Sequence, residues 1–353
     1  MADAMRTLPD AELEVISRVT QAQIAETAAY LDSTPIAVHC VDTPHIFDIQ
    51  ITAFHGEDSA FVRIVDYHTN LVCIRRNGET LLEKECVTRE DGLIDRSCLS
   101  VEGIVAFADT VNLEDVQEVL ERQIAYNMDI AEEGLRGNYG ANIGSTILLG
   151  RESDINCKMR AWAAAASDAR MNGCEKPVVI NSGSGNQGMT VSLPVIEFAK
   201  EWNVSQDKLY RALVVSNLIA VHQKKYIGSL SAYCGAVSAG CGAGAAITYL
   251  SGGSYEDVSL TIVNTIGNVG GIVCDGAKSS CAAKIASAVD AAILAHYMGQ
   301  HHRSFQPGEG IVREDVEDTI KSMGYIGRVG MKDTDTEILN IMIDRVDIDE
   351  VCK

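Results

Sequence analysis

Aromatic residues are scarce in this sequence, and so is positive charge. Only 5% of the 353 residues are aromatic, whereas 30 are glycine. This composition predicts a core of small residues in which helices approach one another closely. With 29 basic and 49 acidic residues, the formal net charge is −20. The charge excludes a nucleic-acid binder, which needs clustered lysine and arginine, and it disfavours an anionic membrane surface as partner.

A secretory signal is also lacking, because Met1–Asp10 contains no apolar core. Tyr226–Tyr255 carries no charge over a length that would span a bilayer, but glycine, alanine and serine dominate it. We therefore expect a buried helix of a cytoplasmic protein rather than a membrane span. In that compartment the 11 cysteines are thiols or metal ligands and not disulfides.

The hydrophobic pattern predicts an α+β fold with two domains, residues 1–110 and 111–353. The first domain combines a helix at 9–31 with a small antiparallel sheet that ends near Lys84. The second domain is all helical and begins with a helix from Asn112 into the 130s. Strands are expected at Ile36–Val41, Ile46–Phe54, Ala60–Asp66 and Thr69–Arg75. Further helices are expected at 155–172, 190–220, 228–250, 256–268, 278–299 and 312–324.

A glycine loop, Gly183–Gly188, matches the dinucleotide-binding string G-x-G-x-x-G. A dinucleotide site also needs a following helix and a second strand that ends in an acid, and no such strand follows here. No Gly-Lys-Ser/Thr follows either, so the loop is not a P-loop. The loop instead offers backbone N–H groups and neutral side chains near a helix start, which suits a small carboxylate-bearing molecule. We expect neither NAD nor pyridoxal phosphate as cofactor.

Three cysteines in the helical part are candidate metal ligands. Cys234 lies forty residues before Cys274, and Cys281 follows seven residues later, with Gly276 between them to let the chain turn. Ligation by thiolates alone favours an iron–sulfur cluster, zinc or copper(I). The absence of C-x-x-C spacing argues against a zinc ribbon or a ferredoxin.

From about residue 30 to its end, the sequence resembles the L-cysteine desulfidase family, which is related to the α chain of iron–sulfur L-serine dehydratases. Many strings match in order, which a chance similarity would not produce. They are Asp66–Leu71, Ala165–Met171, Asn181–Met189, Ile227–Cys234, Gly271–Cys281, Gly310–Val312 and positions within Gly330–Leu339.

The resemblance implies a [4Fe–4S] cluster held by Cys234, Cys274 and Cys281, with one iron left open as a Lewis acid. It also implies a β-elimination in which a base removes the Cα proton and the β substituent leaves. Cysteine would lose sulfide, serine would lose hydroxide, and both would yield pyruvate and ammonia. We expect a small-molecule substrate and a homodimer. The expected substrate-binding residues are Ser182, Gly183, Ser184, Asn186, Gln187, His68 and Asn70.

The chain departs from the family at its N-terminus. Full-length relatives begin with a further segment that carries a Gly-Cys-Thr-Glu-Pro motif, whose cysteine is a candidate base or ligand. Nothing in this sequence matches that motif, so we expect a truncated chain or a separate polypeptide that supplies it, and the catalytic base is unassigned. Cys241 is expected to pack in a helix, and Cys352 is a less favoured fourth ligand.

Three functions remain open from the sequence. The first is an L-cysteine desulfidase, the second an L-serine dehydratase, and the third an inactive cluster- or zinc-binding fragment or subunit. The dehydratase loop is richer in Pro-Thr-Asn-Gly than Asn181–Gly188, which favours cysteine. Lys278 is a candidate for the substrate carboxylate or a solvated lysine, and Asp168 with Arg170 is either a buried pair or a support for the loop.

Overall fold

The structure is a computed structural model that describes residues 19–45, 47–86, 95–228 and 230–348. The chain divides into two compact units, Met1–Pro44 with Leu339–Lys353, and His45–Ile338. The first unit contains helix α1 (Gln21–Ser33), which begins at Thr20 with a capping box formed with Gln23. The first ten residues of the helix expected at 9–31 lie outside the described ranges. The expected domain boundary at residue 110 stays a prediction.

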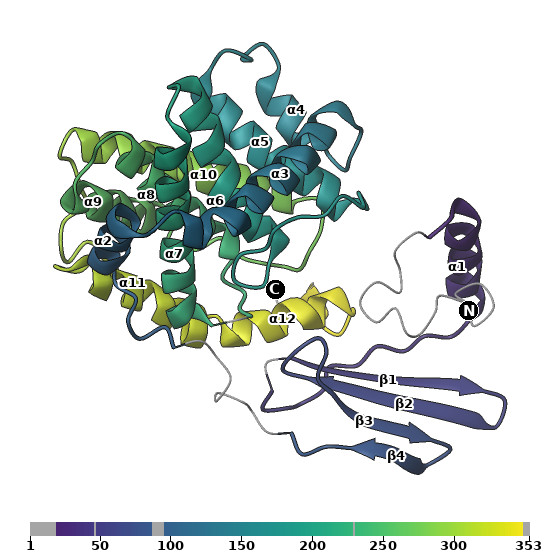
Figure 1. Ribbon diagram of the computed structural model, residues 1–353. Helices are drawn as coiled ribbons and strands as arrows, with labels where there is room; N and C mark the ends of the chain where they lie inside the picture. The colour runs from purple at the N-terminus through teal and green to yellow at the C-terminus, as the bar shows by residue number, and fades with distance from the viewer. Residues whose placement is uncertain (1–18, 46, 87–94, 229, 349–353) are drawn as a thin grey trace. The chain divides into compact units, whose positions relative to one another are not determined.

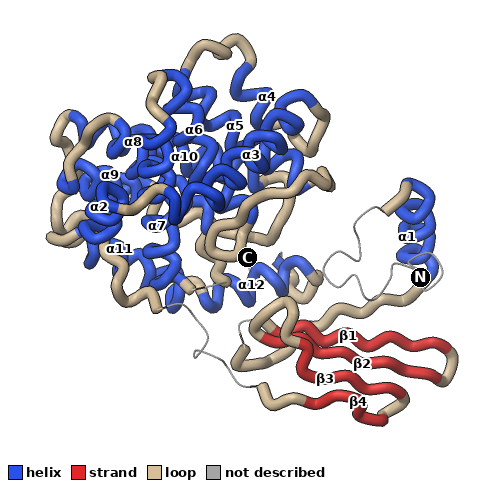
Figure 2. Tube along the Cα trace, in the orientation of Figure 1, coloured by secondary structure: helices blue, strands red, loops and turns tan. Residues whose placement is uncertain are grey.

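The second unit begins with four strands that form one antiparallel sheet in the order β1-β2-β3-β4 (Figure 2). This sheet and the helices that follow it confirm the α+β class. The segment Ile36–Val41 was expected to be a strand, which is wrong: it pairs with no described strand, and an apolar run needs a partner for its backbone groups. The strands are β1 (Asp48–His55), β2 (Asp58–Val65), β3 (Leu71–Arg76) and β4 (Glu79–Glu83).

Helices make up the rest of the unit (Figure 1). The helix expected at 190–220 is in fact two helices. The chain breaks at Asn203, whose φ is 49°, and restarts at Ser205, whose hydroxyl caps the next helix. The helices are α2 (Val101–Thr110), α3 (Glu114–Arg136), α4 (Ile143–Leu148), α5 (Ile155–Met171), α6 (Gly185–Glu201), α7 (Gln206–Ile227), α8 (Gly235–Leu250), α9 (Tyr255–Asn268), α10 (Cys281–Gln300), α11 (Val316–Tyr325), the π-helix Ile326–Gly330 and α12 (Lys332–Met342).

Helix α8 is the expected buried helix, with every residue from Ala236 to Thr248 inside the core. Its glycines lie directly against the backbones of its neighbours. A Cβ added to Gly242 would lie 2.4 Å from the carbonyl oxygen of Ser216 on α7, and one added to Gly240 would lie 2.9 Å from that of Ala288 on α10. Small residues therefore let three helices pack at backbone contact. Within the described ranges, no helix has the length and apolar character needed to cross a membrane.

We predict that Gly242→Ala destabilises the protein although alanine is the better helix former. The helix preference favours alanine by about 1 kcal/mol, but the backbone of α7 must move to admit the methyl group, and overpacking of this kind typically costs about 1–3 kcal/mol or more. Gly330→Ala is the matched control, because its Cβ would meet only the Ile326 side chain at 3.9 Å. Urea unfolding should show a lower free energy for Gly242→Ala alone. Equal stabilities for the two variants would contradict this view of the core.

Candidate functional site

Two of the expected ligands lie at helix starts. Cys234 directly precedes α8, and Cys281 is the first residue of α10. The contacts of Gly240 with Ala288 and of Gly244 with Ala292 show that α8 and α10 run parallel. Six residues before Gly240 is Cys234, and six residues before Ala288 is Ala282, which directly follows Cys281. The parallel alignment therefore places Cys234 at the level of Ala282. The packing of the core therefore brings the two helix starts together.

Cys274 is brought to Cys234 by a short antiparallel pairing of two loops. The Cys234 N–H donates to the carbonyl of Ile272 at 2.9 Å, and the Cys274 N–H donates to that of Ala232 at 2.7 Å. An isolated β-bridge lies between these two bonds. The pairing holds both cysteine backbones in place before any ligand binds.

The thiol of Cys234 interacts with the other two cysteines. A hydrogen bond between the thiols of Cys234 and Cys274, together with burial, raises the pKa of Cys234, and the same hydrogen bond lowers the pKa of Cys274 to about 6. The Cys281 thiol donates to the carbonyl of Gly276 at 3.7 Å, and Cys281 lies near enough to Cys234 to contribute to raising its pKa. The three residues expected from their spacing thus lie in one region, and their joint role as ligands stays a prediction.

The gathered thiols match the donor type of an iron–sulfur cluster. Soft thiolates are its usual ligands, and the starts of α8 and α10 place positive helix ends beside them. Among the described residues, however, no set of three or more His, Cys, Asp or Glu side chains has the spacing of a formed metal site. The ligand set Cys234, Cys274 and Cys281 therefore stays a prediction.

The glycine loop leads into α6 and lies next to the cysteines. Ser182 and Gly183 have positive φ values of 49° and 80°, and they form a tight turn that leaves Ser184 as the N-cap of α6. The Gln187 side chain lies against Gly235, where an added Cβ would be 2.5 Å from its Cδ. The first turn of α6 is therefore in contact with the residue that follows Cys234.

Several polar side chains of the loop already have partners. The Ser184 hydroxyl accepts from the Gln187 N–H at 3.4 Å, and the Ser182 hydroxyl donates to Asn181 at 2.9 Å. Asn186 Oδ1 accepts from Arg170 Nη1 at 3.3 Å, but its Nδ2 donates to no described residue. Oε1 of Gln187 is buried and has no partner in that part of the chain. Asn186 and Gln187 thus retain the most capacity to bind a ligand.

Arg170 supports the loop and does not form the buried pair with Asp168 that was one of its two expected roles. Its guanidinium lies against Gly185, 2.5 Å from the position of an added Cβ. Asp168 instead accepts from the Gly144 N–H at 2.9 Å. Burial raises the pKa of Asp168 and lowers that of Arg170.

Lysines near the cysteines differ in their partners. Lys278 lies 2.7 Å from Asp275, and Lys284 also pairs with Asp275; these two hydrogen bonds lower the pKa of Asp275 to about 2. Lys278, considered for the substrate carboxylate, therefore shares the single Asp275 carboxylate with Lys284. Lys224, near the end of α7, is only 5% exposed. Burial lowers its pKa to about 8, and the nearby Cys234 and Cys274 act on that pKa in the opposite direction.

The two expected residues outside the helices make their recorded contacts within the sheet region. The His68 ring lies 4.9 Å from that of Phe47, and Asn70 donates to the Val65 carbonyl at 2.8 Å. Their role in substrate binding stays a prediction. Cys241 is fully buried in α8, consistent with packing. Cys352 lies outside the described residues.

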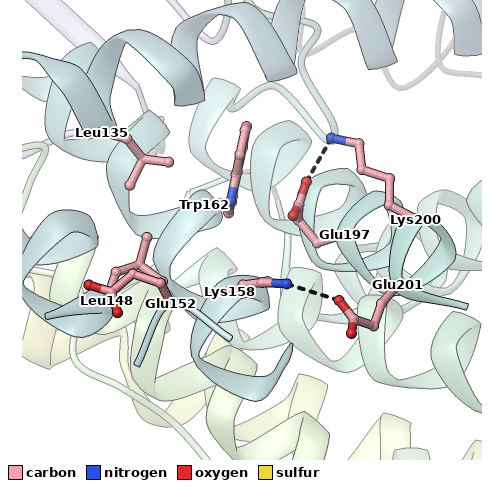
Figure 3. A pocket seen from close by; sticks show the side chains of 8 residues that line it. All are labelled: Leu135, Leu148, Glu152, Lys158, Trp162, Glu197, Lys200 and Glu201. Atoms are coloured by element: carbon pink, nitrogen blue, oxygen red, sulfur yellow. Dashed lines mark hydrogen bonds and ion pairs between the residues drawn. The ribbon is translucent and has the colours of Figure 1, made fainter. Parts of the chain in front are cut away.

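A surface depression lies at the far end of α5 and α6 (Figure 3). An ion pair joins Lys158 on α5 to Glu201 on α6 at 2.9 Å, and another joins Lys200 to Glu197 within α6 at 2.8 Å. Lys158 precedes Arg170 by twelve residues, roughly 18 Å along α5, so the depression is separate from the cysteine site. Its lining residues are Leu135, Leu148, Glu152, Lys158, Trp162, Glu197, Lys200 and Glu201.

Comparison with known proteins identifies the family. The family model described as serine dehydratase alpha chain matches residues 10–340. The chain belongs to this family. It is 53% identical over 337 residues to a UPF0597 protein of Desulfitobacterium hafniense (strain Y51), covering 95% of this chain and 78% of the relative. UPF0597 proteins of Lachnoclostridium phytofermentans and Treponema denticola are 50% and 45% identical, covering 94% and 95% of this chain and 80% and 79% of the relatives. The names of these relatives state no activity.

In this member of the serine dehydratase alpha-chain family, the sequence did not identify two residues that support the loop, the buried Asn127 and the half-buried Asn217. Asn127 on α3 donates to the Gly188 carbonyl at 3.1 Å and accepts from the Val179 N–H at 3.0 Å. Asn217 on α7 accepts from Asn181 at 3.0 Å. An amide side chain inside an otherwise regular helix was the available signal, but only the fold shows which loop it meets.

We predict that Asn127→Ala lowers the free energy of unfolding by about 1–3 kcal/mol. The substitution leaves the partly buried Val179 N–H without its partner, whereas the Gly188 carbonyl keeps its hydrogen bond from the Ser192 hydroxyl. Asn138→Ala is the control, because Asn138 is exposed. Denaturant unfolding of both variants checks this prediction, and a parental stability for Asn127→Ala would show that the loop is held by other contacts.

Proposed function

We propose that this protein is a [4Fe–4S]-dependent lyase that converts L-cysteine to pyruvate, ammonia and hydrogen sulfide. The observation that supports it most is the gathering of Cys234, Cys274 and Cys281 beside the glycine loop, in a member of the serine dehydratase alpha-chain family. The three thiols would hold the cluster, and the loop would hold the amino acid.

The proposed reaction is a β-elimination. A base takes the Cα proton, the electrons of that C–H bond form the Cα=Cβ double bond, and the Cβ–S bond breaks to release sulfide. The resulting aminoacrylate tautomerises and takes up water to give pyruvate and ammonia. A bound cluster with three protein ligands supplies a Lewis-acidic iron for the leaving group.

The glycine loop is proposed to position the substrate for this step. The first N–H groups of α6, at Gly185 and Asn186, have no partner within the helix and suit an anionic oxygen. The Asn186 side chain adds a neutral donor. Fixed donors of this kind orient the Cα–H toward a base and the β substituent toward the cysteines.

L-Serine is the second candidate substrate, and the family description favours it. The elimination would be the same, with hydroxide as the leaving group. Sulfide is the better ligand for iron, which favours cysteine. Anaerobic reconstitution with iron and sulfide, followed by assays of pyruvate, ammonia and sulfide with each amino acid, decides between them. A brown, iron-bearing protein without activity on either one would refute the lyase and support an inactive cluster-binding protein.

We predict that Cys234→Ser, Cys274→Ser and Cys281→Ser each abolish cluster binding after anaerobic reconstitution, because each removes one of three soft ligands. Cys241→Ser is the matched control, a buried cysteine in the same region that should leave most of the iron bound. Iron content and visible absorbance measure the outcome. Loss of the cluster in Cys241→Ser, with retention in Cys281→Ser, would show that the assignment is wrong.

We predict that Asn186→Ala keeps iron content and fold but lowers kcat/KM for L-cysteine by about ten- to a hundredfold. The expected loss is that of one hydrogen bond to a charged group, about 1.5–3 kcal/mol. Asn112→Ala, at an exposed position before α3, should behave as the parent. If Asn186→Ala also turns over cysteine at the parental rate, the loop is only a turn.

A further inference from the structure

Lys224 is a buried cation without an acidic partner. It lies in the last turn of α7 and is 5% exposed. No carboxylate pairs with it in the described ranges, whereas Lys278 and Lys284 both pair with Asp275. Burial of an unpaired ammonium group is costly and is rarely tolerated without an anion nearby.

The packing of α7 against α8 sets Lys224 level with the cysteine site. Gly242 contacts Ser216 and Ala220 on α7, and Ala239, earlier on α8, shares a buried cluster with Ala220, so the two helices run antiparallel. Seven residues before Gly242 is Gly235, the first residue of α8, and the matching level of α7 is that of Lys224. Cys234 and Cys274 lie near enough to Lys224 to raise its pKa, which agrees with this placement.

The same end of the core collects further positive potential. The starts of α6, α8 and α10 meet there, since Gln187 contacts Gly235 and Cys281 acts on Cys234. Each helix is at least 16 residues long, and its first N–H groups carry partial positive charge. Two arginines of this region also pair with no described acid: Arg170, whose guanidinium holds Asn186, and Arg96, whose charge helps to lower the pKa of Lys224.

We propose that Lys224 binds the α-carboxylate of the amino-acid substrate. This assignment rests on the proposed lyase function. Lys224 supplies the charged contact to the carboxylate, and the N–H groups at the start of α6 supply neutral hydrogen bonds. An α-amino acid brings the anion that this side chain lacks. Lys224 lies on the same side of α7 as Asn217, two turns away, and Asn217 holds the glycine loop. Helix α7 therefore positions both Lys224 and the loop.

The test measures binding without turnover. L-Alanine keeps the carboxylate and ammonium groups of the substrate but has no leaving group, and ethylamine lacks the carboxylate. Titration calorimetry with the reconstituted protein should show that L-alanine binds more tightly than ethylamine. Lys224→Met should weaken L-alanine binding by about ten- to a hundredfold, leave ethylamine unchanged and retain iron. Lys224→Arg should restore part of the affinity.

Lys225→Met is the matched control, because the neighbouring lysine lies over the Tyr226 ring instead of in the core. It should bind L-alanine as the parent does. Lys224→Met should also melt at the same or a higher temperature in the ligand-free state, since it removes an unpaired buried charge. A lower melting temperature for Lys224→Met would show that the charge is needed for folding, and this result would contradict the proposal.

Three other results overturn the assignment. Unchanged L-alanine affinity in Lys224→Met would show that the carboxylate is held elsewhere. Loss of iron in that variant would show that the positive charge of Lys224 supports cluster binding by the cysteines instead of substrate binding. No difference between L-alanine and ethylamine in the parent would exclude a carboxylate site. Failure of the proposed lyase is seen separately, as a lack of products from cysteine and serine, because the binding measurement needs no reaction.

Discussion

The contact of α8 with the backbones of α7 and α10 is the constraint on which the rest of the site depends. Glycines on α8 bring the helices so close that their relative positions are set by backbone atoms and not by adaptable side chains. Since Cys234 precedes α8, Cys281 begins α10 and Lys224 ends α7, that one packing arrangement fixes three chemical groups at the same end of the core. The scarcity of aromatic residues has its physical reason here, because a large side chain at Gly240 or Gly242 would separate these helices.

Electrostatics then distinguishes this end of the core from the others. Parallel α6, α8 and α10 all present their N-terminal ends to it, and their dipoles add there. The thiols of Cys234 and Cys274 are hydrogen-bonded, and Asp275 pairs with both lysines that follow Cys274. Lys224, in contrast, pairs with no carboxylate of the described residues. The sequence contains more acidic than basic residues, yet no described carboxylate pairs with this buried lysine. We therefore infer that a bound ligand supplies the anion.

The sequence predicted the parts of this structure that depend on local pattern. The strands at Asp48–Val65 and the helix at Ile155–Met171 follow from periodicity and turn residues, whereas the shared role of the three cysteines stays a prediction. The errors arose at segments whose structure depends on contacts with other parts of the chain or on the conformation of a single residue. Ile36–Val41 is apolar but pairs with no described strand, and the break at Asn203 is a left-handed residue within an otherwise continuous helical pattern. No second strand follows the helix that Gly183–Gly188 begins, and the expectation that this loop binds no dinucleotide stays a prediction.

Residues that depend on packing were not predictable in the same way. Asn127, Asn217 and Lys224 belong to no motif, and in the sequence each is one polar residue within a helix. Their roles follow from which helix face is turned inward and from what lies opposite, and both are set by distant glycine contacts. The glycine loop illustrates the dependence: Ser184 can cap α6 on local grounds alone, yet the loop acquires a ligand-facing side only because Asn127 and Asn217 hold it from two other helices. In this family member, the candidate site is therefore a property of the helix packing first and of its sequence motifs second.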